Sequence, residues 1–284
     1  MDRVRTLTVA AALLAVLIPA PPASAAVPSG HAREAARAKK PPVVVIVMEN
    51  HEYGTIMRSS SASYLTRRFR RRATLFTRYH ALHHPSLPNY LDMTSGTTSG
   101  CRSDSCPRKT YRTNNLFHQL SHQGIGWVAW QESMPKRCAL NSSGSYAVKH
   151  NPPAYYRDLF PKICPRRDRP YPSKLPAALP PFTFITPNEC HDMHDCSIAV
   201  GNRWLKTHVP PLLKRGAVVV ITFDEGTTSE GGGGHVYAAV AGPGIKRGAK
   251  DTHRYTHEGL LAGLERWFGV PRLHGAKKAR SLPL

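Results

Sequence analysis

The sequence is poor in acidic residues. Its 284 residues include 18 Asp and Glu against 39 Lys and Arg, which gives a formal net charge of +21. Such a positive field concentrates polyanions, anionic lipid surfaces and phosphorylated molecules near a protein. No zinc-finger, RNA-recognition or basic-zipper pattern accompanies the charge, which argues against sequence-specific reading of nucleic acid. We therefore expect anionic partners, such as a lipid or cell-wall surface, and no specific nucleic acid.

Long hydrophobic runs are missing beyond the first residues, so we expect no transmembrane segment. Residues 7–20 are apolar, but this run is short for a bilayer span. Arg3 and Arg5 precede it, and the small residues Ala23-Ser24-Ala25 follow it. This is the pattern of a secretory signal peptide. The sequence therefore predicts an exported, extracellular protein.

Composition divides the chain into four parts. We expect a signal peptide at residues 1–26, a basic disordered lead-in at 27–41, a single domain at 42–273 and a loose basic tail at 274–284. The length of the third part suits one α/β core rather than two. We found no internal repeat in it.

A C-x-x-C knuckle is also absent, which argues against a zinc–thiolate cluster. All six cysteines lie after the expected signal peptide, and an even number of cysteines in an exported chain indicates disulfides. Their spacing suggests the pairs Cys101–Cys106, Cys138–Cys164 and Cys190–Cys196. Sequence alone leaves the other pairings open.

Two hydrophobic runs end in metal-ligand residues. Val43–Val47 runs into Met48-Glu49-Asn50-His51, and Val218–Phe223 runs into Asp224-Glu225. Both runs are typical of buried strands. In open α/β sheets the carboxyl ends of the strands form the edge where ligands bind. The sequence therefore predicts that these oxygen ligands meet in one crevice, although such carboxylates can also simply cap a following helix or turn.

The rest of the chain alternates between strand and helix patterns. Helical spacing predicts five helices: Ser61–Arg72, a segment from about Tyr90, a segment capped by Asn114, Ile198–Leu213 and Thr256–Phe268. Strand patterns occur at Trp127–Trp130, Phe182–Thr186 and His235–Val240. Residues 135–181 are expected to form long loops held by cysteines, and Gly231–Gly234 a mobile loop. This alternation predicts an α/β fold with a mostly parallel sheet and helices on both faces.

Two further segments carry candidate site residues. His84-Pro85-Ser86-Leu87-Pro88-Asn89 places Ser86 just before a helix, where free backbone N–H groups favour phosphate. The segment Thr186–Asp195 contains His191 and Asp192, and His235 follows the glycine loop. Carboxylate, amide and imidazole groups on several strand ends suit a divalent metal, which can activate a hydroxyl and neutralise phosphate charge.

Together these segments resemble the phosphoesterase family of the alkaline-phosphatase superfamily, which includes acid phosphatases and bacterial phospholipases C. The resemblance covers residues 43–273 and rests on motifs in a fixed order. These are Met48-Glu49-Asn50-His51, His84 to Tyr90, Trp130 to Pro135, Lys149 to Pro152, Ile185 to Asn188 with His191-Asp192, and Thr222 to Glu225. It implies the three-layer sandwich of that superfamily, with helices on both faces of a mostly parallel sheet.

The resemblance also implies roles for individual residues. Ser86 is expected to attack phosphorus and form a phospho-enzyme. Glu49, Asn50, Asp224 and Glu225, with Ser86 itself, are expected to bind a metal. The remaining candidates are His84, His150, His191, His235 and Asp192, which would protonate the leaving group, contact the phosphate or bind a second metal. Among them, Asp192 is expected to be a metal ligand. His84, His191 and His235 are expected to be catalytic groups.

The expected ligand set differs from that of the two-metal phosphatases of the superfamily. Glu49, Asn50 and Glu225 partly replace their Asp- and His-rich set. Oxygen-rich ligation of this kind is compatible with calcium, magnesium or manganese. Zinc and iron remain open. Thr94 and Ser95 are rival hydroxyls to Ser86.

The expected function is hydrolysis of phosphate esters of the acid-phosphatase kind. Three alternatives remain: a phospholipase C-type phosphodiesterase, a catalytically degenerate polyanion-binding protein, and, because the resemblance is to a superfamily that also contains them, a sulfatase or phosphonate hydrolase. The sulfatase signature requires an Arg where this chain has Tyr90, which disfavours that alternative.

Overall fold

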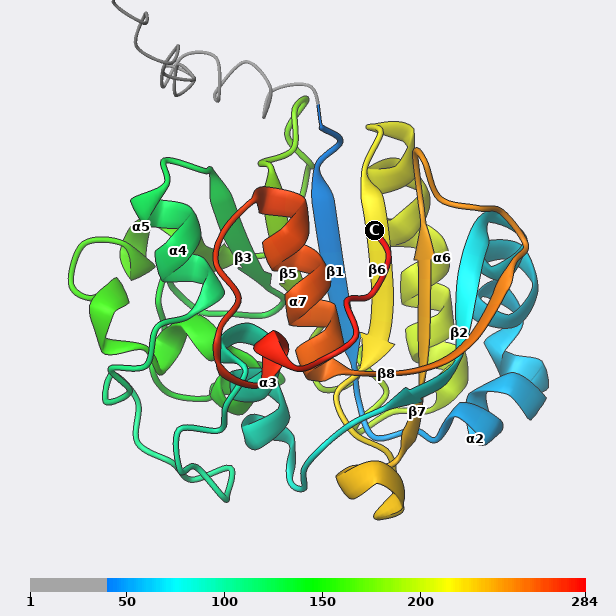
Figure 1. The fold of residues 1–284 in the computed structure, drawn as a ribbon, viewed down its shortest axis with the longest axis horizontal. Helices are drawn as coiled ribbons and strands as arrows, with labels where there is room; N and C mark the ends of the chain where they lie inside the picture. Colours follow the sequence, from blue (N-terminus) through cyan, green and yellow to red (C-terminus); the bar gives the residue numbers. More distant parts are fainter. Residues whose placement is uncertain (1–39) are drawn as a thin grey trace, which may run out of the picture. The chain divides into compact units, whose positions relative to one another are not determined.

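An eight-stranded sheet forms the centre of residues 40–284, the part of the chain that the computed structural model describes (Figure 1). The strands are β1 (Val43–Met48), β2 (Ala73–His80), β3 (Trp127–Gln131), β4 (Asp168–Pro170), β5 (Phe182–Thr186), β6 (Val218–Phe223), β7 (His235–Ala241) and β8 (Lys250–Thr256). Their order across the sheet is β4-β3-β5-β1-β6-β7-β2-β8. The expected signal peptide and residues 27–39 of the expected lead-in lie outside the described residues.

The sheet is mostly parallel, as the sequence predicted. β1 pairs in parallel with β5 and β6, β3 with β4 and β5, and β2 with β8. Only β7 runs the other way among the described strands, because it pairs antiparallel with both β6 and β2. The carboxyl ends of the remaining strands therefore share one edge of the sheet.

The two central strands bring the acidic motifs together. Every residue of β1 and of β6 is buried, in keeping with their runs of Val and Ile. The register pairs Val43 with Val218 and Met48 with Phe223. The backbone N–H of Asp224 then donates to the Met48 carbonyl at 2.9 Å. Glu49 and Asp224 thus leave the sheet from adjacent positions.

Helices cover both faces of this sheet. They are α2 (Tyr53–Arg58), α3 (Ser86–Ser95), α4 (Leu116–His122), α5 (Cys164–Arg167), α6 (Ile198–Lys214) and α7 (His257–Phe268). Figure 1 shows α7 in front of β1 and β5, with α6 behind the sheet. Phe182 of β5 packs edge-on against Phe268 of α7, with ring centroids 5.8 Å apart. The expected three-layer α/β arrangement is confirmed.

Several local expectations differ from the structure. Asn115, not Asn114, caps α4, because its side chain accepts from the His118 N–H at 2.9 Å. The expected helix Ser61–Arg72 is irregular, with a π-helical turn at Tyr64–Phe69 between short 3₁₀ turns. β2, β4 and β8 were not anticipated, because their sequences lack a clear apolar period.

The end of the chain is not a loose tail. Ala276 and Leu282 are fully buried. The Leu282 N–H donates to the Gly259 carbonyl of α7 at 2.8 Å, and Gly275 N–H donates to the Gly96 carbonyl at 2.9 Å. The apolar residues between the basic ones supply this packing, which charge alone did not reveal.

The three suggested disulfides are formed: Cys101–Cys106, Cys138–Cys164 and Cys190–Cys196. The second joins two positions within the region 135–181, and the third closes the segment after β5. Within residues 40–284, no helix has the length and apolar character needed to cross a bilayer.

Candidate active site

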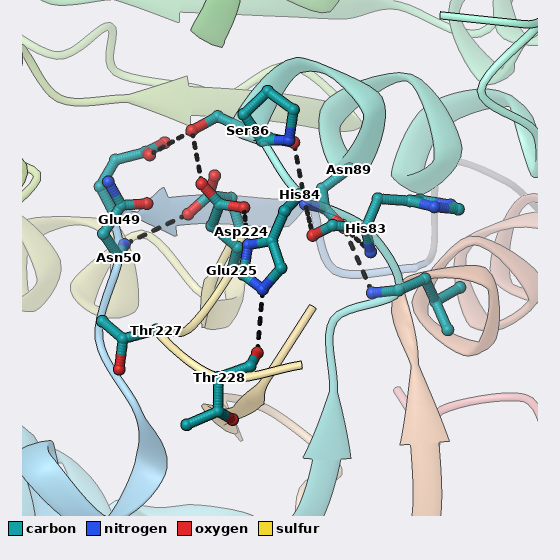
Figure 2. A network of polar contacts seen from close by, with 12 residues as sticks. Glu49, Asn50, His83, His84, Ser86, Asn89, Asp224, Glu225, Thr227 and Thr228 are labelled. Carbon is teal, nitrogen blue, oxygen red and sulfur yellow. Dashed lines mark hydrogen bonds and ion pairs between the residues drawn. The ribbon is translucent and has the colours of Figure 1, made fainter. Parts of the chain in front are cut away.

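Ser86 is the first residue of α3, and Figure 2 shows its side chain beside Glu49 and the Asp224–Glu225 pair. The turn before it is fixed by Asn89, whose Oδ1 accepts from the backbone N–H of Leu82 at 3.2 Å and of His83 at 3.0 Å. The Asn89 amide in turn donates to the His83 carbonyl at 2.8 Å. Since all ten residues of α3 are buried, the Ser86 hydroxyl is held in a rigid frame.

Two carboxylates face the Ser86 hydroxyl. Its Oγ lies 3.2 Å from Glu49 Oε2 and 3.2 Å from Glu225 Oε1. A hydroxyl carries one proton, so it donates to one of these carboxylates at a time. The rival hydroxyls lie in the last turn of the same helix, where Thr94 Oγ1 donates to the Tyr90 carbonyl and Ser95 Oγ to the Leu91 carbonyl. The structure therefore sets Ser86 apart from Thr94 and Ser95.

Two residues outside the expected ligand set complete the surroundings of Glu49. The Tyr90 hydroxyl donates to Glu49 Oε1, and Tyr90 is one helical turn after Ser86. His150 Nε2 lies 3.4 Å from Glu49 Oε2, and its Nδ1 lies 3.4 Å from Asp192 Oδ2. The Tyr90 and His150 rings stack, with centroids 5.3 Å apart. Tyr90 follows Ser86 by four residues, a spacing that puts both side chains on one face of a helix, and this was the sequence signal for the place of Tyr90 in the site.

Burial and mutual repulsion disturb the carboxyl groups of this cluster. Burial, with the charges of Asp224 and Asp192, raises the pKa of Glu49 well above its ordinary value. Burial and the charge of Glu225 raise the pKa of Asp224 to about 7. Burial, assisted by Asp224, raises the pKa of Asp192 to about 9. Several buried carboxylates without a cation are costly, so the cluster favours a bound positive charge.

The free donor atoms of the cluster fit a metal ion. Among residues 40–284, the buried atoms without a hydrogen-bond partner include Asn50 Oδ1, Asp224 Oδ2, Asp192 Oδ2 and His150 Nε2. Glu49, His150 and Asp192 each place a donor atom within 4.8 Å of the others. Asn50 adopts a left-handed backbone, with φ 55°, and its N–H donates to Asp224 Oδ1 at 3.3 Å. Oxygen atoms dominate this set, which suits a hard divalent cation.

His84 joins the cluster to the loop after β6. Its Nδ1 lies 2.5 Å from Glu225 Oε2, and its Nε2 donates to the Thr228 carbonyl at 2.9 Å. Burial lowers the pKa of His84, but the Thr228 carbonyl and Glu225 together raise it above its ordinary value. Because both ring nitrogens have protein partners, His84 is placed to orient Glu225.

The other two histidines expected to be catalytic lie in different polar groups. His191 Nδ1 is 3.0 Å from Glu132 Oε2, and its side chain is 38% exposed. His235 Nε2 donates to the Thr77 carbonyl at 2.9 Å, and its ring stacks on Tyr53 and on His80. Asp192, next to His191, does reach the cluster. The structure thus brings together Glu49, Asn50, His84, Ser86, Asp192, Asp224 and Glu225, but neither His191 nor His235 shares a described hydrogen bond or ion pair with them.

Comparison with known proteins gives a consistent result. Residues 58–271 match the model of the Phosphoesterase family. The chain is 31% identical over 218 residues to a phosphate-repressible acid phosphatase of Penicillium chrysogenum, covering 70% of this chain and 53% of that protein. It is 30% identical over 202 residues to a phosphatidylinositol-3-phosphatase of Mycobacterium tuberculosis, covering 69% and 66%. The chain therefore spans about half to two thirds of the length of these relatives.

Solved structures show the same fold at low sequence identity. A protein of the alkaline phosphatase superfamily from Vibrio parahaemolyticus aligns with a TM-score of 0.58 at 12% identity, covering 86% of this chain and 71% of that one. Murine ectonucleotide pyrophosphatase / phosphodiesterase 5 aligns with a TM-score of 0.59 at 9% identity, covering 82% and 96%.

Proposed function

Because this chain belongs to the phosphoesterase family, we propose that it hydrolyses phosphate monoesters in the manner of an acid phosphatase, with Ser86 as the nucleophile. The position of Ser86 Oγ, 3.2 Å from both Glu49 and Glu225 at the start of a buried helix, carries this proposal. A hydroxyl becomes a useful nucleophile when a neighbouring base takes its proton.

The chemistry follows from this arrangement in two steps. Glu225 or Glu49 accepts the Ser86 proton while Oγ bonds to phosphorus, and the bond from phosphorus to the ester oxygen breaks. The carboxyl group that took the Ser86 proton returns it to the leaving alcohol oxygen, and Ser86 carries the phosphoryl group. Water then attacks phosphorus and gives a proton to the same carboxylate, which passes it to the Ser86 oxygen as the bond from phosphorus to Ser86 breaks. At the start of α3 the Leu87 N–H donates to Asp104 Oδ1 at 3.0 Å and Pro88 has no N–H. The positive end of the helix dipole, rather than a set of free N–H groups, therefore favours the phosphate oxygens in both steps.

Glu49, Asn50, Ser86, Asp224 and Glu225 are the residues that would hold a divalent metal ion, with Asp192 next to them. A bound cation supplies Lewis-acid stabilisation of phosphate charge and lowers the pKa of a hydroxyl beside it. The unpartnered oxygens of Asn50, Asp224 and Asp192 support this. Calcium, magnesium and manganese suit the oxygen-rich set best, and zinc and iron remain alternatives.

The imidazoles divide the supporting roles. We assign His84 to positioning Glu225, because its two nitrogens are already bonded. His150 lies against Glu49 and Asp192 inside the cluster. His191 is anchored by Glu132 through Nδ1, and its Nε2 has no hydrogen bond within residues 40–284, so it is our candidate for a contact with the phosphate or the leaving group. His235 stacks on His80, outside this cluster.

The three disulfides support an exported protein, because such bridges persist in oxidising compartments. The exposed arginines Arg67, Arg68, Arg71 and Arg72 support an anionic substrate or surface. They favour one second candidate, dephosphorylation of a phosphorylated lipid headgroup. The Mycobacterium tuberculosis relative carries the name of such an activity.

Initial rates on p-nitrophenyl phosphate and bis-p-nitrophenyl phosphate test the proposal. The oxidised protein is assayed before and after treatment with a chelator, and single metal ions are then added back. We expect turnover of the monoester that the chelator abolishes and one hard divalent ion restores. Faster turnover of the diester would instead support the phosphodiesterase alternative, and no turnover with any ion would contradict both.

The nucleophile is tested separately with Ser86→Ala and the matched control Ser95→Ala. Ser95 lies in the same buried helix, but its hydroxyl donates to the Leu91 carbonyl. Intact-mass measurement after acid quenching should show a phosphoryl adduct in the wild type and in Ser95→Ala, and none in Ser86→Ala. Wild-type turnover by Ser86→Ala would remove Ser86 from this role.

A further inference from the structure

A second group of side chains suited to a metal ion comprises His80 of β2, His235 of β7 and Glu230 of the glycine loop before β7. His80 ends β2 and His235 begins β7, and the two are direct partners in the antiparallel pair. Their rings stack, with centroids 4.9 Å apart. Glu230 Oε1 lies 3.0 Å from His80 Nε2. One donor atom from each of His80, Glu230 and His235 lies within 4.8 Å of the other two.

The glycine run explains why Glu230 reaches this pair. A side chain at Gly231 would place its Cβ 2.9 Å from His80 Cβ, and Gly231 has a φ of 70°. Side chains at Gly232 and Gly233 would collide with the carbonyl oxygens of Leu82 and His83. The Gly233 N–H donates to the Ala81 carbonyl at 3.1 Å. The loop, expected to be mobile, is thus packed closely on residues 80–83.

Each of the three side chains has an atom that can bind an ion, although His80 Nε2 and Glu230 Oε1 contact one another. The Thr77 carbonyl can only accept, so His235 Nε2 carries a proton and Nδ1 keeps its lone pair. His80 is 6% exposed, and its Nδ1 is buried without a partner among the described residues. The Glu230 side chain is 61% exposed and has a free oxygen beside its contact with His80. The two nitrogens of an imidazole point in divergent directions, so an ion shared with Glu230 would bind His80 through Nε2 and replace the present contact between Nε2 and Glu230.

We propose that His80, His235 and Glu230 bind a transition-metal ion of the zinc class, at a site separate from the oxygen-rich cluster around Ser86. Two imidazoles and one carboxylate form a ligand set that zinc accepts with a fourth position left to water. Imidazole nitrogens favour zinc-class ions, whereas the carboxylate-rich cluster favours harder ions. The two sites therefore differ in the ion that each selects.

The bound ion would tie the glycine loop to two strands of the sheet. This loop also contains Thr228, whose carbonyl accepts from His84, and His84 contacts Glu225 beside Ser86. Occupancy of the second site would therefore restrain the segment that positions Glu225. Arg254 opposes the ion, because its charge acts on both Glu230 and His80.

Zinc titration of the full, oxidised chain tests this proposal without using turnover. Chelator-treated protein is titrated with Zn²⁺ by calorimetry and with Co²⁺ by visible absorption. Glu230→Gln is the first variant, because Glu230 is an exposed loop residue whose replacement leaves the core intact. His235→Gln is the second. We expect each variant to bind one equivalent of zinc fewer than the wild type and to lose the cobalt absorption of an imidazole site.

The matched controls are Asp251→Asn and His253→Gln. Asp251 and His253 also form a carboxylate–imidazole pair, at 2.8 Å, but without a second imidazole. Both controls should bind zinc as the wild type does, and Arg254→Met should bind it more tightly. Zinc should raise the midpoint of thermal unfolding in the wild type more than in Glu230→Gln. Equal stoichiometry in the wild type, Glu230→Gln and His235→Gln would overturn the proposal, whatever the outcome of the phosphatase assays.

Discussion

Glu49 and Asp224 stand side by side at the ends of β1 and β6, one position beyond the register pair Met48 and Phe223. Both are fully buried. The negative charge of Asp224 raises the pKa of Glu49, in addition to the larger effect of burial. Residues far apart in the sequence are thus placed in an arrangement that is unfavourable without a cation. This relationship links the stability of the protein to its proposed chemistry.

Asp224→Asn should separate these two effects. Removing one buried charge relieves repulsion, so in chelator we expect the variant to unfold at a higher temperature than the wild type. With the activating metal added, we expect kcat/KM to fall by about 100-fold or more, because a ligand is lost. Thermal unfolding with and without chelator, together with initial rates, provides the test. A variant that is less stable than the wild type in chelator would contradict the repulsion argument.

Tyr90→Phe should show whether the hydroxyl of Tyr90 supports Glu49. The substitution leaves a buried carboxylate oxygen without its donor, which costs about 1–3 kcal/mol in the free energy of unfolding. We also expect about tenfold weaker metal binding. Urea unfolding and metal titration measure the two effects. Tyr155→Phe is the control, because the buried Tyr155 hydroxyl has no described hydrogen-bond partner and its removal should cost nothing.

Sequence was sufficient for the parts of the site that depend on local pattern. The hydrophobic runs ending in Glu49 and Asp224 predicted buried strands, and the parallel-sheet rule then predicted that their ends meet. The Pro-Ser-Leu-Pro turn predicted Ser86 just before a helix that starts at about Tyr90, and in the structure this helix begins at Ser86 itself. These features depend only on the hydrophobic runs and the turn within short segments, and in each segment this local pattern agrees with the fold.

Other parts depend on long-range pairing that sequence does not specify. His80 lies on β2, which has no clear apolar period, so its register with His235 could not be foreseen. His191 shows a second limit of the sequence. It precedes Asp192 directly, yet its side chain contacts Glu132 whereas that of Asp192 contacts His150. Adjacent positions in the chain therefore face different groups.

Asp168 should make stability depend on pH. Burial raises its pKa to about 8, although the Asn151 amide lowers it in part. The folded protein therefore keeps this proton up to about pH 8, whereas the unfolded chain loses it near about pH 4. Between these values the folded state binds more protons, so the free energy of unfolding falls as pH rises, by up to about 1.4 kcal/mol per unit.

Asp168→Asn removes this slope and keeps an acceptor for Asn151, whose amide lies 2.8 Å from Asp168 Oδ2. We expect the variant to gain stability over the wild type steadily from pH 5 to pH 8, as measured by urea unfolding. Asp251→Asn should show no such gain, because hydrogen bonds from His253 overcome partial burial and hold the pKa of Asp251 below its usual range. A constant difference between Asp168→Asn and the wild type over this range would contradict the prediction.

Glu52, which directly precedes α2, should control the site through the loop after β6. Its Oε1 accepts from the N–H groups of Thr227 and Thr228 and from the Thr228 hydroxyl, at 2.9 to 3.0 Å. Glu52→Ala releases this loop, so the Thr228 carbonyl no longer holds His84 in place. A displacement of about 1 Å in a reacting group can cost about 100-fold in rate. We therefore expect kcat/KM to fall by about 10- to 100-fold.

Two further variants distinguish loop position from charge. Glu52→Gln keeps an oxygen acceptor for the same three donors, so most activity should remain. Gly226→Ala should behave like Glu52→Ala, because a Cβ at this position would collide with Glu52 Oε1 and push the loop aside. Initial rates on a phosphate monoester compare the three. If Glu52→Gln were as damaged as Glu52→Ala, the negative charge of Glu52, rather than its hold on the loop, would be the property that matters.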